Sequence, residues 1–276
     1  MLNKKYILGV GITDATKEEI LEYIVKSLEN FKKKYYVVTP NPEFLVLVHK
    51  NKDFKNILNK AELASNDAVG ISLAGKILGK KLKGRFTGVD LVENLCKKMV
   101  RKPITVGFLG GRGGVAEAAA ECLQKKYPGL KVSFVGEEWP AELFSDQKAK
   151  LETRNLKLEA IKPFHPPSSN FKDPTSSFYG LSSREIDILF VAFGAPKQEF
   201  WISENLDKIP VKIAIGVGGA FDYISGKTPR APLFLRSIGL EWLFRLIIQP
   251  WRIKRQFALL EFVWLVLKEK FKSNIA

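Results

Sequence analysis

The chain has 276 residues, of which 46% are hydrophobic and 26% are charged, a balance typical of a globular protein with one large or two small domains. It contains two cysteines, Cys96 and Cys122, which argues against a disulfide scaffold and a zinc site and favours a reducing compartment. The net charge of +15 predicts an anionic partner: nucleic acid, an acidic membrane face or a phosphate-bearing substrate.

The N-terminal sequence does not have the pattern of a signal peptide. Its apolar run is short, contains two glycines and leads into charged residues, so we expect the protein in the cytoplasm. The run "YILGVGI" (6–12) predicts a strand. Thr16 and Glu19 then fit a Thr-x-x-Glu capping box, which predicts a helix from there to about Phe31.

Predicted strands and helices alternate along most of the remaining chain. Such alternation indicates βαβ units, and therefore an α/β fold with a Rossmann-like parallel sheet flanked by helices. The stretch 163–183, rich in Pro, Ser and Phe, is interpreted as a loop, because the α/β pattern resumes after it. The predicted elements are a strand at 35–39, helices near 43–50, 53–61 and 88–100, a strand–loop–helix–strand unit over 103–136, and strand–helix pairs beginning near 187 and 211.

Four predicted strands end in loops that let backbone approach a ligand closely. These loops read "TPNPE", "GGRGG", "GAPKQE" and "GVGGAFD". In an open parallel sheet, ligands bind beyond the carboxyl ends of the strands. We therefore expect the functional site where these loops meet.

The glycine-rich loop partly fits a dinucleotide-binding fingerprint. Gly111, Gly113 and Ala116 match G-x-G-x-x-[G/A] directly after a strand, and backbone N–H groups at a helix start favour a pyrophosphate. The acidic residue expected about twenty positions later is poorly placed, with Glu137 and Glu138 nearest. Diphosphate binding, a purely structural turn and NAD binding all remain open from this motif.

No Asp-x-Asp pair, which many nucleotide-sugar enzymes use to hold a metal, occurs in the chain. A bound diphosphate would then be neutralised by cationic side chains and backbone amides. The candidates are Arg85, Arg112, Lys197 and Arg230. Each of them alone is better interpreted as a surface cation than as a ligand.

Asp67 is the candidate general base, because it follows an apolar stretch near the strand-end loops. The alternative interpretation is a helix cap. Thr39 and Asn41 lie between a buried strand and a proline, where an Asx turn is the structural alternative to a site role.

The C-terminal segment 239–272 is both apolar and basic. A membrane span needs about 20 mostly apolar residues, whereas the longest candidate, 257–267, has half that and contains Glu261. Three tryptophans and a net charge of +5 over 236–276 instead indicate a helix lying in a membrane interface, although packing on the body is the alternative. Pro250 should kink or divide the helix.

Several motifs, taken together and in order, resemble the WecG/TagA/CpsF glycosyltransferases. The resemblance covers roughly 6–136 and 187–257. It is carried by "TPNPEFL", "R-x-T-G-x-D-L" from Arg85, "FLGGRGGVAEAAA", "DILFVAFGAPKQEFWI", "IGVGGAFDYISG" and "GLEWLFRL…P-x-R-x-x-R". It implies an inverting, metal-independent enzyme without a cofactor, which moves an N-acetylmannosamine-type hexose from UDP to a polyprenyl-diphosphate-linked sugar at the cytoplasmic membrane face.

The resemblance also implies roles for individual residues. Asp67 matches the proposed base, Thr39 and Asn41 match polar residues of the catalytic pocket, and three C-terminal arginines match residues thought to reach the diphosphates. On a continuous helix these arginines would lie on one side. The residues predicted to bind substrate are Arg85, Gly110, Gly111, Gly113, Gln198, Glu199, Arg245, Arg252 and Arg255.

We therefore predict a peripheral membrane glycosyltransferase with a catalytic body (1–235) and a basic, aromatic, helical membrane-docking arm (236–276). Its expected partners are a UDP-sugar, a lipid-diphosphate-linked acceptor and an anionic membrane surface, without nucleic acid; a second copy of the chain is left open. Two alternative functions remain open. One is an NAD-dependent oxidoreductase that uses the Gly111 loop, and the other is a non-catalytic basic module that binds membrane or nucleic acid.

Overall fold

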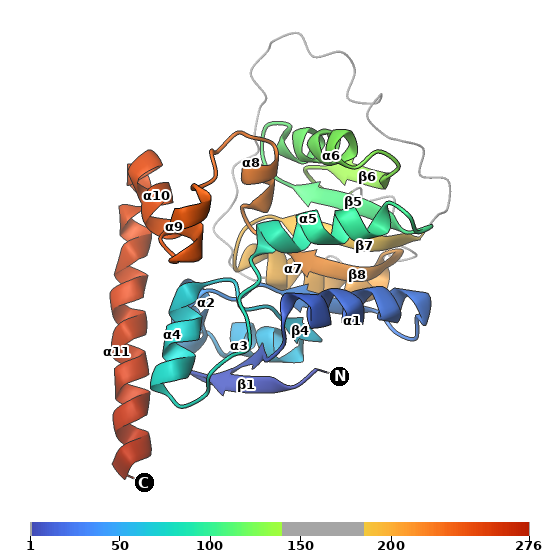
Figure 1. Cartoon of the computed structure of the whole chain (residues 1–276). Coiled ribbons are helices and arrows are strands. Elements are labelled where there is room, and N and C mark those ends of the chain that lie inside the picture. Colours follow the sequence, from blue (N-terminus) through green and yellow to red (C-terminus); the bar gives the residue numbers. More distant parts are fainter. Residues whose placement is uncertain (1, 140–184, 276) are drawn as a thin grey trace, which may run out of the picture.

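The computed structural model describes residues 2–139 and 185–275 (Figure 1), and within them the side chains of 254–255 and 273–275 are not described. The predicted loop at 163–183 lies outside the described residues. The molecule is an α/β fold built on a parallel sheet with helices on both faces, as the alternating sequence pattern predicts.

Six parallel strands form the central sheet, in the order β4-β3-β8-β7-β5-β6. The inner strands are buried on both faces, which explains why their sequences are nearly continuous apolar runs rather than alternating ones. Their order places the carboxyl ends of β3, β8, β7 and β5 side by side. The strands are β3 (Tyr35–Val38), β4 (Leu63–Ala64), β5 (Thr105–Gly110), β6 (Lys131–Gly136), β7 (Ile186–Ala192) and β8 (Val211–Gly216).

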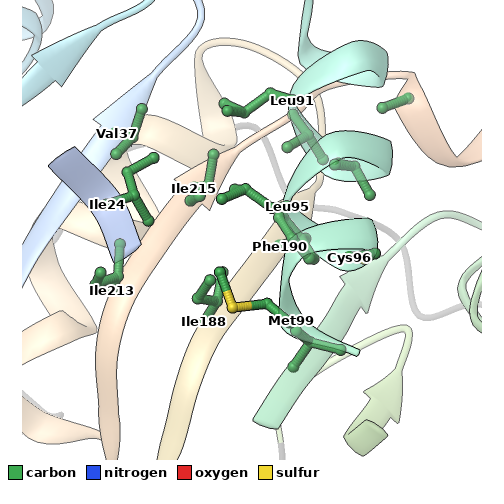
Figure 2. Packing of buried hydrophobic residues seen from close by; sticks show 14 of the residues in the cluster. Ile24, Val37, Leu91, Leu95, Cys96, Met99, Ile188, Phe190, Ile213 and Ile215 are labelled. Carbon is green, nitrogen blue, oxygen red and sulfur yellow. The ribbon is translucent and has the colours of Figure 1, made fainter. Parts of the chain in front are cut away.

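Four helices cover one face of the sheet: α1 (Lys17–Glu29), α5 (Gly88–Met99), α6 (Val115–Lys126) and α8 (Ala220–Ile224). The predicted capping box starts α1, because the Thr16 hydroxyl accepts from the N–H of Glu19 and the Glu19 carboxylate accepts from the N–H of Thr16. In Figure 2, Met99 of α5 faces Ile188 of the sheet, and Leu95, four residues earlier, lies beside Ile215. Each such fully buried side chain contributes about 1.5–3 kcal/mol.

The opposite face is covered by α7 (Lys197–Asn205), the short 3₁₀ helix η3 (Leu206–Lys208), α2 (Pro42–Lys50) and α3 (Lys52–Lys60). Phe54 of α3 stacks on Phe200 of α7, with ring centroids 6.0 Å apart. Asn41 and Asn51 cap the starts of α2 and α3. Beside α2 lies α4 (Val69–Ile77), which begins just after β4.

The prediction of one strand over 6–12 was wrong. The chain there forms a hairpin of β1 (Lys4–Ile7) and β2 (Val10–Thr13), which pair antiparallel outside the main sheet. Leu8 and Gly9 make the turn with φ angles of 48° and 76°, a conformation that favours glycine and suits a two-residue hairpin. An apolar run concealed the turn, because Ile7, Leu8, Val10 and Ile12 around it are all buried.

The C-terminal segment forms α9 (Leu233–Ser237), α10 (Glu241–Ile248), the 3₁₀ turn η4 (Pro250–Arg252) and the long α11 (Ile253–Ile275). Pro250 divides the helix, as predicted. Among the described helices, none combines the length and apolar character that membrane crossing requires. Figure 1 shows α11 along the outside of the molecule next to α4.

One face of α11 belongs to the core. Phe262, Leu265 and Val266 are buried in the same cluster as α2, α4 and the β1–β2 hairpin. This face of α11 therefore packs on the body, while its other face is exposed. The predicted division after residue 235 falls within α9 and stays a prediction.

Candidate active site

A cavity of about 1850 Å³ lies beyond the carboxyl ends of β3, β5, β7 and β8, between the sheet and helices α4, α10 and α11. The loops that were expected to meet there do so. Its lining includes most of the predicted site residues: Thr39, Asn41, Asp67, Arg85, Gly111, Gly113, Gln198, Arg245 and Arg252. Gly110 and Glu199 are not among the lining residues.

Asp67 lies between β4 and α4, on the cavity wall. Its Oδ1 accepts a hydrogen bond of 2.7 Å from the N–H of Gly88, in the first turn of α5. Burial raises the pKa of Asp67 to about 6; the charge of Glu241 raises this pKa as well, while the Gly88 bond and the charge of Arg85 lower it. A carboxylate with this pKa is ionised at neutral pH and can accept a proton.

Thr39 and Asn41 also line the cavity, and both have structural roles. The Thr39 hydroxyl donates to the carbonyl of Gly216 at 2.9 Å and so joins the ends of β3 and β8. The Asn41 side chain accepts from the N–H of Phe44 at 3.2 Å and caps α2. The two residues therefore fix the loop that forms this side of the cavity.

The glycine-rich loop is built from residues with left-handed backbone. Gly110, Gly111, Gly113 and Gly114 have φ angles between 70° and 100°. A Cβ on Gly110 would lie 2.9 Å from the backbone of β7, so Gly110 shapes the loop without reaching the cavity. At the start of α6 the N–H of Gly114 donates to the Glu137 carboxylate at 2.9 Å, so a carboxylate already occupies this helix terminus.

Gln198 ties two site loops together. Its side-chain Oε1 accepts from the N–H of Gly194 at 3.2 Å and from the N–H of Gly218 at 3.0 Å. Its Nε2 donates to Glu199 Oε1 at 2.7 Å. Glu199 is fully buried, and this burial raises its pKa to about 7. Gln198 faces the cavity and Glu199 supports it from behind.

Arg245 of α10 reaches the cavity beside Tyr223 and Asp222. Its guanidinium carbon lies 4.7 Å from the centre of the Tyr223 ring, and Nη2 lies 3.7 Å from Asp222 Oδ2. Nη2 is buried, and among the described residues it has no hydrogen-bond partner. Its free donor capacity points to an anionic ligand, because a buried donor is normally satisfied.

Gln249 holds the two arginines together. Its Oε1 accepts from Nε of Arg245 at 3.3 Å and from Nε of Arg252 at 2.5 Å, while its Nε2 donates to Thr228 at 3.3 Å. The expected row of arginines along one continuous helix was wrong, because the helix breaks at Gln249. The break itself brings Arg245 and Arg252 to the same cavity. The Arg255 side chain lies outside those described.

The other candidate cations divide into two groups. Arg85 lines the cavity and donates to the carbonyl of Arg236 at 3.0 Å; Arg112 and Lys197 are exposed at the rim. Arg230 does not line the cavity. It forms ion pairs with Asp90 and Glu241, and this position does not support its interpretation as a ligand for diphosphate.

The Arg230 pairs are structural. Its Nη2 lies 2.7 Å from Asp90 Oδ1 in α5, and its Nε lies 3.3 Å from Glu241 Oε1 in α10. They fasten the C-terminal helices to the body. They also hold Glu241 in position, where its charge contributes to the raised pKa of Asp67.

Comparison with known proteins decides the class. The model of the glycosyl transferase WecG/TagA/CpsF family matches residues 5–276. The chain belongs to this family. It is therefore a glycosyltransferase, and neither the oxidoreductase nor the non-catalytic alternative is retained. The match extends beyond the two stretches that carried the resemblance and includes the C-terminal helices.

Its curated relatives align over almost their whole length. The chain is 27% identical to an N-acetylglucosaminyldiphosphoundecaprenol N-acetyl-β-D-mannosaminyltransferase of Bacillus spizizenii, over 99% of this chain and 94% of the relative. Proteins of the same name from Bacillus subtilis and Staphylococcus aureus are 25% and 27% identical, over 96% and 98% of this chain and 91% and 94% of theirs.

Aromatic residues that the sequence did not single out form one wall of this glycosyltransferase's cavity. Trp139, Phe193 and Trp201 all line it, with Phe193–Trp201 centroids 5.6 Å and Trp139–Trp201 centroids 6.1 Å apart. Such a wall offers flat apolar surface to a sugar or base. The motif "KQEFW" could have pointed to Trp201, because it places Trp201 three residues after Gln198.

Proposed function

We propose that the enzyme transfers an N-acetylmannosamine-type hexose from a UDP-sugar to a polyprenyl-diphosphate-linked sugar, with inversion and without a metal ion, in the synthesis of a cell-wall or surface polysaccharide. The curated relatives are named for transfer of N-acetyl-β-D-mannosamine to N-acetylglucosaminyldiphosphoundecaprenol. Their names support both the sugar class and the acceptor class of the proposal.

The observation that carries the proposal is a carboxylate with a raised pKa that shares one cavity with several cations. Asp67, whose pKa is raised to about 6 mainly by burial, shares the cavity with Arg85, Arg245 and Arg252. A proton acceptor beside preorganised cations suits a displacement in which a hydroxyl loses a proton and a diphosphate leaves.

In the proposed reaction the acceptor hydroxyl oxygen attacks the anomeric carbon of the donor sugar. The new C–O bond forms on the face opposite UDP, and the bond from the anomeric carbon to the UDP oxygen breaks. The proton of the hydroxyl passes to Asp67, and UDP leaves with the bonding electron pair. A single displacement of this kind inverts the anomeric centre and requires no enzyme nucleophile.

The arginines meet the charge of the diphosphate. Arg245 Nη2 has unused donor capacity among the described residues, and Gln249 holds Arg252 beside it. Bidentate arginine–phosphate contacts are strong and geometrically specific. These cations can take the role that a divalent metal has in other nucleotide-sugar enzymes.

We also propose that α11 attaches the enzyme to the inner face of the cell membrane. Trp251 of η4 and Phe257, Leu260, Trp264 and Phe271 of α11 are between 56% and 71% exposed, and segment 236–276 carries a net charge of +5. Exposed aromatic and aliphatic side chains on a basic helix suit an anionic interface.

A donor screen tests the proposal. The enzyme is supplied with a polyprenyl-diphosphate-linked N-acetylglucosamine acceptor and a panel of UDP-sugars, in EDTA, and the anomeric configuration of the product is read by NMR. We expect turnover with UDP-N-acetylmannosamine, unaffected by EDTA, and a β-linked product from an α-linked donor. Loss of turnover in EDTA with rescue by magnesium would refute metal independence, and retention would refute the single displacement.

A further inference from the structure

The cavity has a second, apolar part that the transfer reaction does not use. Away from Asp67 it continues between α4 and α11 and is lined there by hydrocarbon side chains. The lining residues of this part are Val69, Leu73, Ala74 and Ile77 of α4 and Leu259, Phe262, Val263, Val266 and Leu267 of α11.

The two helices run in the same direction, away from the polar part of the cavity. Near the start of α4, a side chain on Gly70 would approach the Phe262 ring to 3.7 Å. Just beyond the end of α4, Lys80 pairs with Glu269 at 3.4 Å. Because α4 begins next to Asp67 and α11 begins next to Arg252, both helices lead from the charged centre outward.

The apolar part is an open groove rather than a closed pocket. Ala74, Phe262 and Val266 are at most 5% exposed and form its floor. Leu73 and Ile77 on one side, and Val263 and Leu267 on the other, are 44–54% exposed and form its walls. From Leu259 to Leu267 α11 rises about 12 Å.

We propose that this groove binds the isoprenoid chain of the acceptor, with the diphosphate at Arg245 and Arg252; the proposal rests on the proposed function. The groove is continuous with the polar part of the cavity. A ligand that fits both parts has an anionic head followed by a hydrocarbon tail, and the order of charges and apolar side chains along the cavity fixes its direction. About 12 Å accommodates the first few isoprene units, and the remainder of the chain continues into the bilayer.

The groove differs from the surface of α11 that is proposed to face the membrane. Leu259 and Val263 line the cavity, whereas Phe257, Leu260 and Trp264 do not and are 56–70% exposed. One helix thus carries two apolar faces. Leu259 lies on the groove face and its neighbour Leu260 lies on the outward face. A substitution of Leu260 is therefore a matched control for substitutions in the groove.

Binding of farnesyl diphosphate and of inorganic diphosphate to the full-length enzyme, measured by calorimetry without vesicles or donor, tests the proposal. We expect the farnesyl compound to bind at least tenfold more tightly, since burial of a few CH₂ groups has about this effect. Leu73→Gln and Val263→Gln should weaken farnesyl diphosphate binding about fivefold or more and leave inorganic diphosphate binding unchanged. Both residues are about half exposed, so these variants should fold normally.

The control is Leu260→Gln, which should change neither affinity. Equal affinities of the two diphosphates for wild-type enzyme would overturn the proposal. An effect of Leu260→Gln equal to that of the groove variants would place the chain on the outer face of α11 and would also overturn it. This binding assay needs no turnover. A negative result in the donor screen, which tests the proposed function, can therefore be distinguished from a negative result in this assay, which tests whether the groove binds the isoprenoid chain.

Discussion

The Asp67 carboxylate is held by one short hydrogen bond in an environment that disfavours its charge. Burial raises its pKa to about 6, and the N–H of Gly88 compensates only in part. Asp67→Asn keeps an oxygen that can accept from Gly88 but removes the proton acceptor. We expect turnover to fall by about 10²–10⁴-fold with UDP binding retained, measured by steady-state kinetics and calorimetry. Unchanged turnover would remove Asp67 from the mechanism.

The same carboxylate should make stability depend on pH. The folded pKa of about 6 lies above the ordinary value of 3.8, so the native state binds the proton more tightly, and ionisation destabilises the fold as pH rises from about 4 to 6. Asp67→Asn should therefore be more stable than wild type above pH 6, by up to about 3 kcal/mol. The difference should vanish below pH 4. Urea unfolding at pH 4 and pH 7.5 measures it, and equal differences at both pH values would contradict it.

Gln249 is predicted to orient the two arginines rather than to take part in the reaction itself. Its one carbonyl oxygen accepts from both Arg245 and Arg252, so Gln249→Ala should leave both charges present but less well oriented. We expect kcat/KM to fall about tenfold, an effect of roughly 1.4 kcal/mol, with vesicle binding unchanged. Lys272→Ala, an exposed cation on the same C-terminal segment, serves as the control and should leave kcat/KM at the wild-type value.

The side chains of the candidate site were partly predictable. The fold class predicts a site where the strand-end loops meet, and the family resemblance singled out Asp67, Thr39, Asn41 and Gln198, all of which line the cavity. Gln249 was missed, because its importance depends on a helix break that brings two flanking arginines together. The hydrogen-bond roles of Thr39 and Asn41 needed coordinates, since the partner of Thr39 lies 177 positions away.

Helices and strands were predicted best where caps and periodicity agreed. The capping box of α1 and the strand–loop–helix–strand unit of β5, α6 and β6 are confirmed. The hairpin of β1 and β2 was missed because Ile7, Leu8, Val10 and Ile12 around its turn are apolar and buried, so no polar residue marked the turn. The prediction that the C-terminal arginines lie along one side of a helix was wrong for a related reason. It assumed a continuous helix, and the helix ends before Pro250.

The C-terminal helices should be needed for more than attachment. Phe262, Leu265 and Val266 fill the core beside α2 and α4, and Arg245 and Arg252 line the cavity. A chain ending at residue 236 should therefore lose turnover even on an acceptor without a long lipid, and should have a lower melting temperature. Full activity of the shortened chain on that acceptor would reduce these helices to an anchor.

Arg252→Ala separates the two effects of shortening. It removes one of the eight Lys and Arg side chains of 236–276 and none of the core residues. Turnover should fall while the melting temperature stays near wild type, and vesicle binding should weaken by no more than about 1 kcal/mol. A matching fall in vesicle binding and turnover would favour contact with lipid headgroups instead.

Membrane attachment should depend on the outward face of α11 and on charge together. Replacing Leu260 and Trp264 by Ser removes two side chains that are 70% and 56% exposed and should abolish most binding to anionic vesicles. Tyr6→Ser, which changes an exposed residue of β1, is the control. Wild-type binding should weaken as salt rises, and salt-independent binding would argue against the electrostatic contribution.

The sequence predicted the general architecture better than it predicted how the C-terminal helices pack against the rest of the molecule. The parallel sheet and the helices on both faces are confirmed, and a cavity lies at the carboxyl edge, where the site was expected. The sequence did not predict which face of α11 is buried. Its apolar residues surround the helix, so no single apolar stripe marks the side that faces the core.

The first and last elements of the chain share one core. Ile7, Val10 and Ile12 of the hairpin belong to the same cluster as Phe262 and Val266 of α11. During synthesis the hairpin leaves the ribosome long before α11 exists, and the apolar side of α4 then has no cover. The nascent chain can assemble its sheet early, but the wall of the cavity that α11 contributes forms only after α11 is released. A chain in which α11 has not yet been made therefore has an incomplete cavity.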